Sequence, residues 1–195
     1  MTSTVSALEA QSEDFLQLPT IASGEFRLVA GRLGRAGEDR PLEINELVAI
    51  SEGLARTLPL WSSTTNARQR TWSLIAASAT YEAWLIEWPP GGRIDLHDHG
   101  LSAGGVAVAR GELRETTVVR ADSGSAHCET QAIRAGESVR FGAHYVHDFT
   151  NVGSSPALSI HVYSPRLTAM TYFDLVEGRL VPGHTSRFSP GSHVP

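Results

Sequence analysis

Two kinds of hydrophobic pattern divide this chain near residue 70. In the first part, apolar residues recur at helix-like intervals in residues 6–18 and again after Pro41. The second of these patterns contains Leu42, Leu47, Ile50, Leu54 and Leu58. Pro41 fits the first turn of a helix, where a missing N–H costs nothing. We therefore predict that residues 1–66 form a helical N-terminal part.

From Arg70 onward the chain consists of short runs rich in Val, Ile, Thr and aromatic residues, separated by Gly, Pro, Asn, Asp and Ser. This pattern is typical of antiparallel strands that close a sandwich or a barrel. We predict a mainly β fold, with a small β-barrel over residues 70–174 and the N-terminal helices packed outside it. Small barrels often hold a ligand or metal in their mouth. The polar residues 183–195 are predicted to be an extended tail.

Length and composition restrict the protein class. A chain of 195 residues suits one domain with its own core, so we predict a single domain over residues 1–195. The net charge of −5, without a Lys/Arg cluster, argues against a nucleic-acid partner. No apolar run approaches the roughly 20 residues of a membrane-spanning helix, and the N-terminus lacks a signal-peptide pattern, so we expect a cytoplasmic protein without a membrane partner. Cys128 is the single cysteine, which excludes an internal disulfide.

The sequence DLHDHG at residues 95–100 contains two candidate metal ligands. An isolated histidine is more often a hydrogen-bonded or surface residue than a ligand. His97 and His99, however, are two residues apart, and on a strand such residues point to the same face. Two imidazoles on one face can share an ion, and imidazole suits iron, zinc, copper and nickel.

The residues around this pair resemble the first motif of the cupin superfamily. Gly91, His97, His99 and Gly111 have the separations of that motif, whereas Gly104 stands where a cupin has a glutamate. A metal held by this site would therefore have neutral imidazole ligands and no carboxylate.

A second cupin-like motif follows. Gly136, His147 and Asn151 have its separations, while Gly142 and His144 replace the usual proline and glycine. This spacing selects His147 as the third ligand and leaves His144 outside the site.

A third signature is SIHVYSP at residues 159–165. Ser159, His161 and Tyr163 occupy alternate positions of one predicted strand, so their side chains face the same way. These residues could simply form the half-polar face of a strand. They could also form a hydrogen-bond relay in which the imidazole orients the phenol beside a metal.

Together these motifs make the chain resemble the cysteine dioxygenase family of thiol dioxygenases, over roughly residues 70–174. The matching segments are Trp88, HDHG at residues 97–100, GELRET at 111–116, HDFTN at 147–151 and SIHVYSP at 159–165. The resemblance implies a jelly-roll-type cupin barrel in which His97, His99 and His147 bind one Fe(II) per chain. It also implies that Ser159, His161 and Tyr163 form a catalytic relay.

The resemblance further implies that a small thiol and O2 are the reaction partners. The thiol would bind iron as a thiolate, and both oxygen atoms would end on sulfur as a sulfinate, without an external reductant. L-cysteine, giving cysteine sulfinate, is the first candidate substrate. The alternative is 3-mercaptopropionate or a related small thiol. We expect a monomer or a weak homo-oligomer.

The family binds the substrate carboxylate with an arginine upstream of the first motif. Arg70 is our candidate, because a planar guanidinium matches a carboxylate, and Arg68 and Arg166 are the competitors. Relatives that prefer 3-mercaptopropionate can carry this arginine nine residues after the tyrosine, where this chain has Tyr172. Tyr172 therefore favours cysteine as the substrate.

Two other classes of function remain open on the sequence. One is a cupin enzyme of different chemistry, such as an isomerase or a dioxygenase acting on carbon, which predicts a carboxylate ligand where this chain has Gly104. The other is a non-catalytic cupin that binds a metal or a small ligand, which does not require Ser159, His161 and Tyr163 together.

Overall fold

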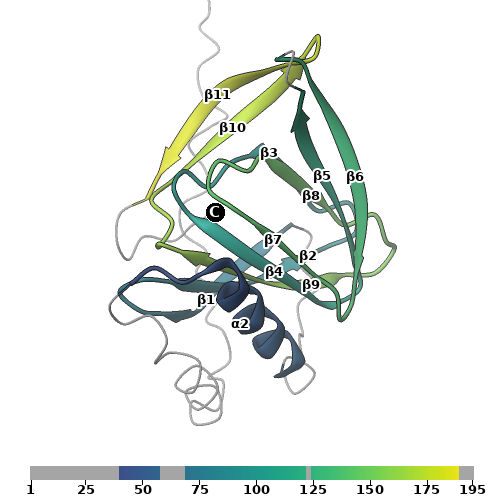
Figure 1. Ribbon diagram of the computed structural model, residues 1–195. Coiled ribbons are helices and arrows are strands. Elements are labelled where there is room, and N and C mark those ends of the chain that lie inside the picture. Colours follow the sequence, from purple (N-terminus) through teal and green to yellow (C-terminus); the bar gives the residue numbers. More distant parts are fainter. Residues whose placement is uncertain (1–39, 58–68, 122–123, 189–195) are drawn as a thin grey trace, which may run out of the picture.

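The computed structural model describes residues 40–57, 69–121 and 124–188, which form one helix and eleven strands (Figure 1). The helix is α2 (Ile44–Thr57). The strands are β1 (Thr71–Ala77), β2 (Glu82–Trp88), β3 (Arg93–His97), β4 (Ala103–Arg110), β5 (Glu112–Arg120), β6 (Ala126–Arg134), β7 (Ser138–Phe141), β8 (His147–Thr150), β9 (Ala157–Ser164), β10 (Ala169–Val176) and β11 (Arg179–Arg187).

The strands form two antiparallel sheets that enclose the interior of a barrel (Figure 1). One sheet has the order β1-β2-β9-β4-β7, and the other has the order β11-β10-β3-β8-β5-β6. The mainly β, jelly-roll-type cupin barrel with a helix outside it is therefore confirmed. The interior core between the sheets includes Trp84, Trp88, Leu113, Phe141 and Phe149.

Strand β9 is buried on both faces, and this positions the relay residues. Ser159, His161 and Tyr163 face the interior between the sheets, while Ile160 and Val162 belong to a second core outside the barrel. That second core is closed by α2, which lies against the sheet containing β4 and β9 (Figure 1). Along residues 159–163 the polar side chains therefore lie on the inner face of β9 and the apolar ones on its outer face.

Helix α2 confirms the hydrophobic pattern of the sequence but begins later than Pro41. Leu47, Ile50 and Leu54 are buried against the outer face of the sheet, where each such side chain contributes about 1.5–3 kcal/mol. The helix starts at Ile44 because Glu46 reaches back to accept a hydrogen bond from the Glu43 N–H at 2.8 Å, as in a capping box. The pattern at residues 6–18, and Leu58, lie outside the described residues.

The C-terminal region differs from the prediction. Residues 183–187 were expected in an extended tail, but they belong to β11, which pairs with β10 and extends the six-stranded sheet. Positive φ angles at Glu177 (49°) and Gly178 (73°) form the tight turn of this hairpin, so the barrel sheet runs past residue 174 to Arg187. The single-domain boundary of 1–195 stays a prediction, because both ends of the chain lie outside the described residues.

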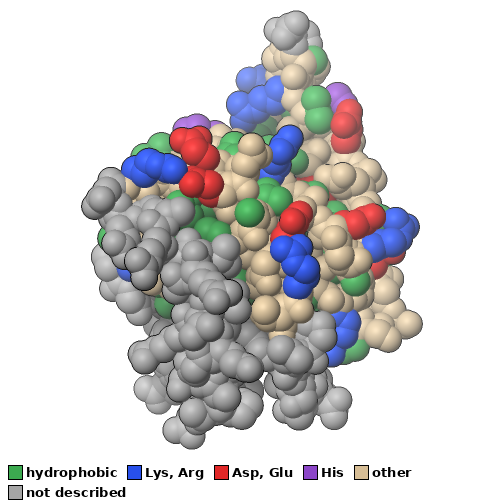
Figure 2. All heavy atoms as spheres, turned by 60° about the horizontal axis from the view of Figure 1, so that its bottom comes forward, with side chains coloured by type: hydrophobic (Ala, Val, Ile, Leu, Met, Phe, Trp, Pro, Cys, Tyr) green, Lys and Arg blue, Asp and Glu red, His purple; other side chains and the backbone are tan. Residues whose placement is uncertain are grey.

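Acidic and basic side chains are interspersed on the face shown in Figure 2, which brings the bottom of Figure 1 forward. Within the described parts of the chain, no helix has both the length and the apolar character needed to cross a membrane.

Candidate metal centre

The three predicted histidine ligands meet on the inner side of the six-stranded sheet. His97 is the last residue of β3 and pairs with His147, the first residue of β8. His99 lies two residues past the end of β3, so the turn after the strand, and not strand alternation alone, brings it to the site. The turn is held by Asp98, whose Oδ1 accepts hydrogen bonds from the N–H groups of Gly100 and Thr171, both at 3.1 Å.

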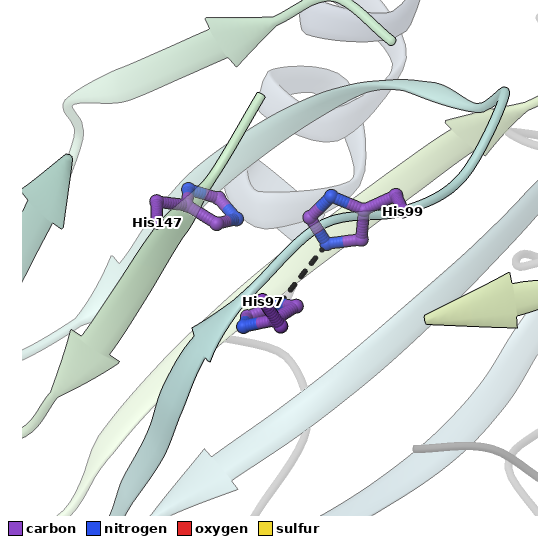
Figure 3. A group of neighbouring side chains, drawn as sticks. All are labelled: His97, His99 and His147. Atoms are coloured by element: carbon purple, nitrogen blue, oxygen red, sulfur yellow. Dashed lines mark hydrogen bonds between the residues drawn. The ribbon is translucent and has the colours of Figure 1, made fainter. Parts of the chain in front are cut away.

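The imidazoles converge through their ligand atoms (Figure 3). One nitrogen from each of His97, His99 and His147 lies within 4.8 Å of the others, and the Nε2 atoms of His97 and His99 are 3.1 Å apart. The Nδ1 atom of His97 donates to the backbone oxygen of Asp95 at 2.8 Å, and that of His147 donates to the Glu115 carboxylate at 2.7 Å. Because these hydrogen bonds place the ring protons on Nδ1, the Nε2 lone pairs of His97 and His147 are directed toward the space between the three imidazoles.

Burial favours the neutral form of His97 and His99. Removal from water lowers the pKa of His97 and of His99 well below the ordinary value, and the neighbouring imidazoles lower it further. The Nε2 atom of His147 is buried and has no hydrogen-bond partner among the described residues. A cluster of buried imidazoles whose nitrogens converge is suited to a metal ion.

Phe141 occupies the space where a fourth ligand would project. Gly104 on β4 pairs with Phe141 on one side and with Tyr163 on the other. A Cβ atom added at Gly104 would lie 2.2 Å from Cζ of Phe141, whose ring stacks on His99 with centroids 4.6 Å apart. The Phe141 ring therefore fills the space that a glutamate side chain at position 104 would need. The candidate metal ligands are then three histidines without a carboxylate.

We expect Gly104→Ala to destabilise the protein by about 1–3 kcal/mol, because the added methyl group must displace the Phe141 ring. Urea unfolding of the two proteins measures this difference. The matched control is Gly142→Ala, at a position where an added Cβ meets nothing within 4 Å. Equal unfolding midpoints for the two variants would show that Phe141 moves aside without cost.

The side chains of Ser159, His161 and Tyr163 on β9 are linked by hydrogen bonds. The Ser159 hydroxyl lies 2.9 Å from Nε2 of His161, and Nδ1 of His161 lies 3.2 Å from the hydroxyl of Tyr163. Trp88 adds a further hydrogen bond to this series, since its indole N–H donates to Ser159 Oγ at 2.8 Å. The ring of Tyr163 lies against His99, with centroids 5.0 Å apart.

The Trp88 indole fixes one direction in this series of hydrogen bonds. An indole N–H can only donate, so Ser159 accepts from Trp88. With the His161 ring proton on Nδ1, Ser159 would donate to Nε2 and Nδ1 would donate to Tyr163, which leaves the phenol O–H free to donate. Burial raises the pKa of Tyr163 above its usual range, and the charge of Glu82 acts in the same direction, so the phenol stays protonated.

Arg70 lies against two indoles, those of Trp72 and Trp88. Its guanidinium carbon is 5.3 Å from the ring centroids of both Trp72 and Trp88. Burial lowers the pKa of Arg70, while Tyr172 and Tyr163 raise it, and the arginine in turn lowers the pKa of His97. Trp88 in turn donates to Ser159, so one indole ring separates the guanidinium from the relay residues.

The two competing arginines have different positions. Arg166 donates to the Glu82 carboxylate at 3.3 Å, and Glu82 is itself buried, so Arg166 is already held in an ion pair. Arg68 lies outside the described residues. His144, which the spacing excluded from the ligand set, is exposed at the surface.

Residues 42–175 match the model of a protein family described as cysteine dioxygenase type I. The chain belongs to this family. The matched range contains the three histidines, the relay strand β9 and Arg70. As a cysteine dioxygenase family member with a three-histidine cluster, the protein has the features of a metal-dependent, dioxygenase-like enzyme of the cupin fold.

Several solved structures resemble this cysteine dioxygenase family member in fold but share little sequence with it. An oxalate oxidase in complex with the substrate analogue glycolate is 20% identical, with a TM-score of 0.45 and coverage of 53% of this chain and 55% of that one. A recombinant oxalate oxidase with glycolate is 19% identical, with a TM-score of 0.47 and coverage of 57% and 58%. The cupin domain of Schizosaccharomyces pombe Cnp3 is 12% identical, with a TM-score of 0.44 and coverage of 52% and 65%.

The chain spans a little more than half the length of these oxalate oxidase chains, 55% and 58%, and the similarities concern the fold alone.

Sequence reasoning missed other residues that shape the centre of this cysteine dioxygenase family member. Glu115 lay within the GELRET segment, yet only the sheet register brings it to His147. Phe141 carried no signal in the sequence, because its role depends on the absence of a side chain at Gly104. His184, from the segment expected to be a tail, stacks on Tyr172 with ring centroids 4.3 Å apart.

Proposed function

We propose that this protein is an iron-dependent thiol dioxygenase that oxidises L-cysteine with O2 to cysteine sulfinate. The proposed metal ligands are His97, His99 and His147, which hold one Fe(II) per chain. The observation that carries the proposal is the convergence of these three buried imidazoles beside the Tyr163 phenol, in a member of the cysteine dioxygenase family. A 3-mercaptopropionate dioxygenase is the alternative.

A ferrous ion at this site would supply the coordination positions at which a thiol and dioxygen react. In the overall reaction the thiol S–H bond is broken and both atoms of O2 become bonded to sulfur, so no external reductant is needed. Three neutral ligands leave the remaining coordination positions open to the substrates. The other residues of the site bind and orient the thiol.

Tyr163 is proposed as a fixed hydrogen-bond donor beside His99. With the ring proton of His161 on Nδ1, the phenol would accept a hydrogen bond from His161 and turn its own O–H away from the relay. Ser159 and Trp88 hold the imidazole of His161 in the tautomer that this requires. The donated hydrogen bond would stabilise negative charge that develops on the reacting groups.

Arg70 is proposed to bind the substrate carboxylate. The contacts with Trp72 and Trp88 limit the orientations of the guanidinium and partly remove it from water, which strengthens a bidentate bond to a carboxylate. Tyr172 on β10 stands where relatives that prefer 3-mercaptopropionate can carry an arginine. This difference supports L-cysteine as the substrate over 3-mercaptopropionate. The ring of Tyr172 lies 5.9 Å from that of His97, on the same side of the sheet.

The proposal is tested by oxygen consumption of the iron-loaded protein with L-cysteine and 3-mercaptopropionate in parallel, with assay of the sulfinate products. We expect one O2 consumed per sulfinate formed, and a higher kcat/KM for L-cysteine. A higher value for 3-mercaptopropionate would select the alternative. Iron-loaded protein that consumes no O2 with either thiol would refute thiol dioxygenase activity.

Tyr163→Phe is expected to lower kcat by about 10–100-fold with iron still bound, because the variant removes one positioned hydrogen-bond donor but no ligand. Turnover and iron content are measured on the same preparation. Tyr81→Phe, a buried tyrosine in the core beneath α2, is the control for loss of a phenol hydroxyl. Full turnover by Tyr163→Phe would remove the relay from the mechanism.

A further inference from the structure

The carboxylate of Glu115 is buried next to the candidate metal centre without being one of its ligands. Glu115 is 1% exposed, and its Oε1 accepts the hydrogen bond from Nδ1 of His147 at 2.7 Å. Its Oε2 accepts a second one from Nε2 of Gln131 on β6, also at 2.7 Å. Burial of a carboxylate costs free energy unless hydrogen bonds and a positive partner compensate.

The hydrogen bonds identify Glu115 as an acceptor at both oxygens. The amide nitrogen of Gln131 can only donate. His147 must keep the Nε2 lone pair for the site that it shares with His97 and His99, so its proton is on Nδ1. Both partners therefore donate, which is the pattern that an ionised carboxylate satisfies.

The charges of the centre give this carboxylate a role. His97, His99 and His147 are neutral ligands, and Phe141 fills the place of a carboxylate ligand at Gly104. A divalent ion bound by them alone would keep its full positive charge in a buried site, which is unfavourable. The Glu115 carboxylate is hydrogen-bonded to Nδ1 of His147, and Nε2 of the same ring would bind the ion.

We infer that Glu115, clamped by Gln131, is a positioning residue that fixes the tautomer of His147 and supplies the negative charge that three neutral ligands lack. It does so without occupying a coordination position, and those positions stay open to substrates. A carboxylate bonded to the distal nitrogen also raises the basicity of a ligand imidazole. The inference rests on the proposed metal-binding role of the three histidines and not on the identity of the thiol.

The test compares Glu115→Gln with the wild-type protein. Glutamine keeps an oxygen that accepts from His147, and the exposed Gln131 can turn its amide to match, so the variant removes charge and keeps the hydrogen bonds. We expect Glu115→Gln to bind Fe(II) and Co(II) about 10–100-fold more weakly in competition with a chelator. The midpoint potential of bound iron should rise, because the lost negative charge had favoured the ferric state.

Glu129→Gln is the matched control, because it removes the charge of an exposed carboxylate on β6, two residues from Gln131. It should leave metal affinity and potential unchanged. Gln131→Leu is a second variant at an exposed position, which removes the clamp and keeps the Glu115 carboxylate. It should weaken metal binding by a few-fold, and it guards against a folding defect in the buried variant.

Wild-type affinity and potential in both Glu115→Gln and Gln131→Leu would overturn the inference. So would a loss of affinity that merely parallels a fall in the melting temperature of the metal-free protein. Wild-type protein that binds no metal would refute the metal site and this inference together. Wild-type protein that binds iron but oxidises no thiol would refute only the proposed reaction, and the comparison of affinities would still decide the role of Glu115.

Discussion

Replacement of His147 by alanine is expected to abolish metal binding and thiol oxidation together. His147 provides one of three converging nitrogens, and two imidazoles alone cannot hold the ion in a fixed geometry. The loss of affinity should exceed the 10–100-fold that is typical of losing an outer hydrogen-bonding partner, ~10³-fold or more. Metal content after gel filtration, chelator competition and oxygen consumption measure the effect on one preparation.

His144→Ala is the control for this prediction. His144 is three residues away in the sequence but is exposed, with a left-handed φ of 63°. Its replacement should leave metal affinity and turnover unchanged. Loss of the metal from the His144 variant, with retention in the His147 variant, would show that the second cupin-like motif had been aligned in the wrong register.

The second large effect is expected from Arg70→Gln. If Arg70 binds the substrate carboxylate, the loss of a bidentate, charge-assisted pair should lower kcat/KM for L-cysteine by about 10²–10³-fold, mainly through KM. Arg70→Lys should recover only part of the loss, because an ammonium lacks the planar fork. Initial rates over a range of thiol concentrations give both constants.

A thiol without a carboxylate separates binding from a general defect. Cysteamine should be a poor substrate for the wild-type protein and should lose little more with Arg70→Gln. Arg93→Gln controls for loss of an exposed arginine, since the side chain of Arg93 is 69% exposed on β3. An equal loss with cysteamine and cysteine would mean that Arg70 supports the fold of the site and does not contact the carboxylate.

Local periodicity explains why much of the candidate site was predictable. Side chains alternate along any strand, so the same-face arrangement of Ser159, His161 and Tyr163 follows from their spacing. The apolar pattern of α2 was predictable for the same reason, since Leu47 and Ile50 mark its buried stripe. The position of the helix start was not, because it depends on a carboxylate that reaches back along the chain.

Features that depend on contacts between distant segments could not be predicted from local periodicity. The strand β11 has a polar sequence, and only its pairing with β10 makes it part of the sheet. Arg70 and Arg166 were equal candidates by type, and the ion pair that holds Arg166 depends on Glu82, 84 residues away. Hydrogen-bond partners of this kind are chosen by sheet register, which no local pattern contains.

The sequence by itself determined the barrel class, the three histidines and the polar face of β9, because these depend on residue type and short-range spacing. Only the tertiary structure decided what surrounds them. It filled the space above Gly104 with Phe141, and it paired the buried Glu115 with His147 and Gln131. Volume and charge at a buried centre are set by every strand that encloses it, and so they appear only when the sheets are assembled.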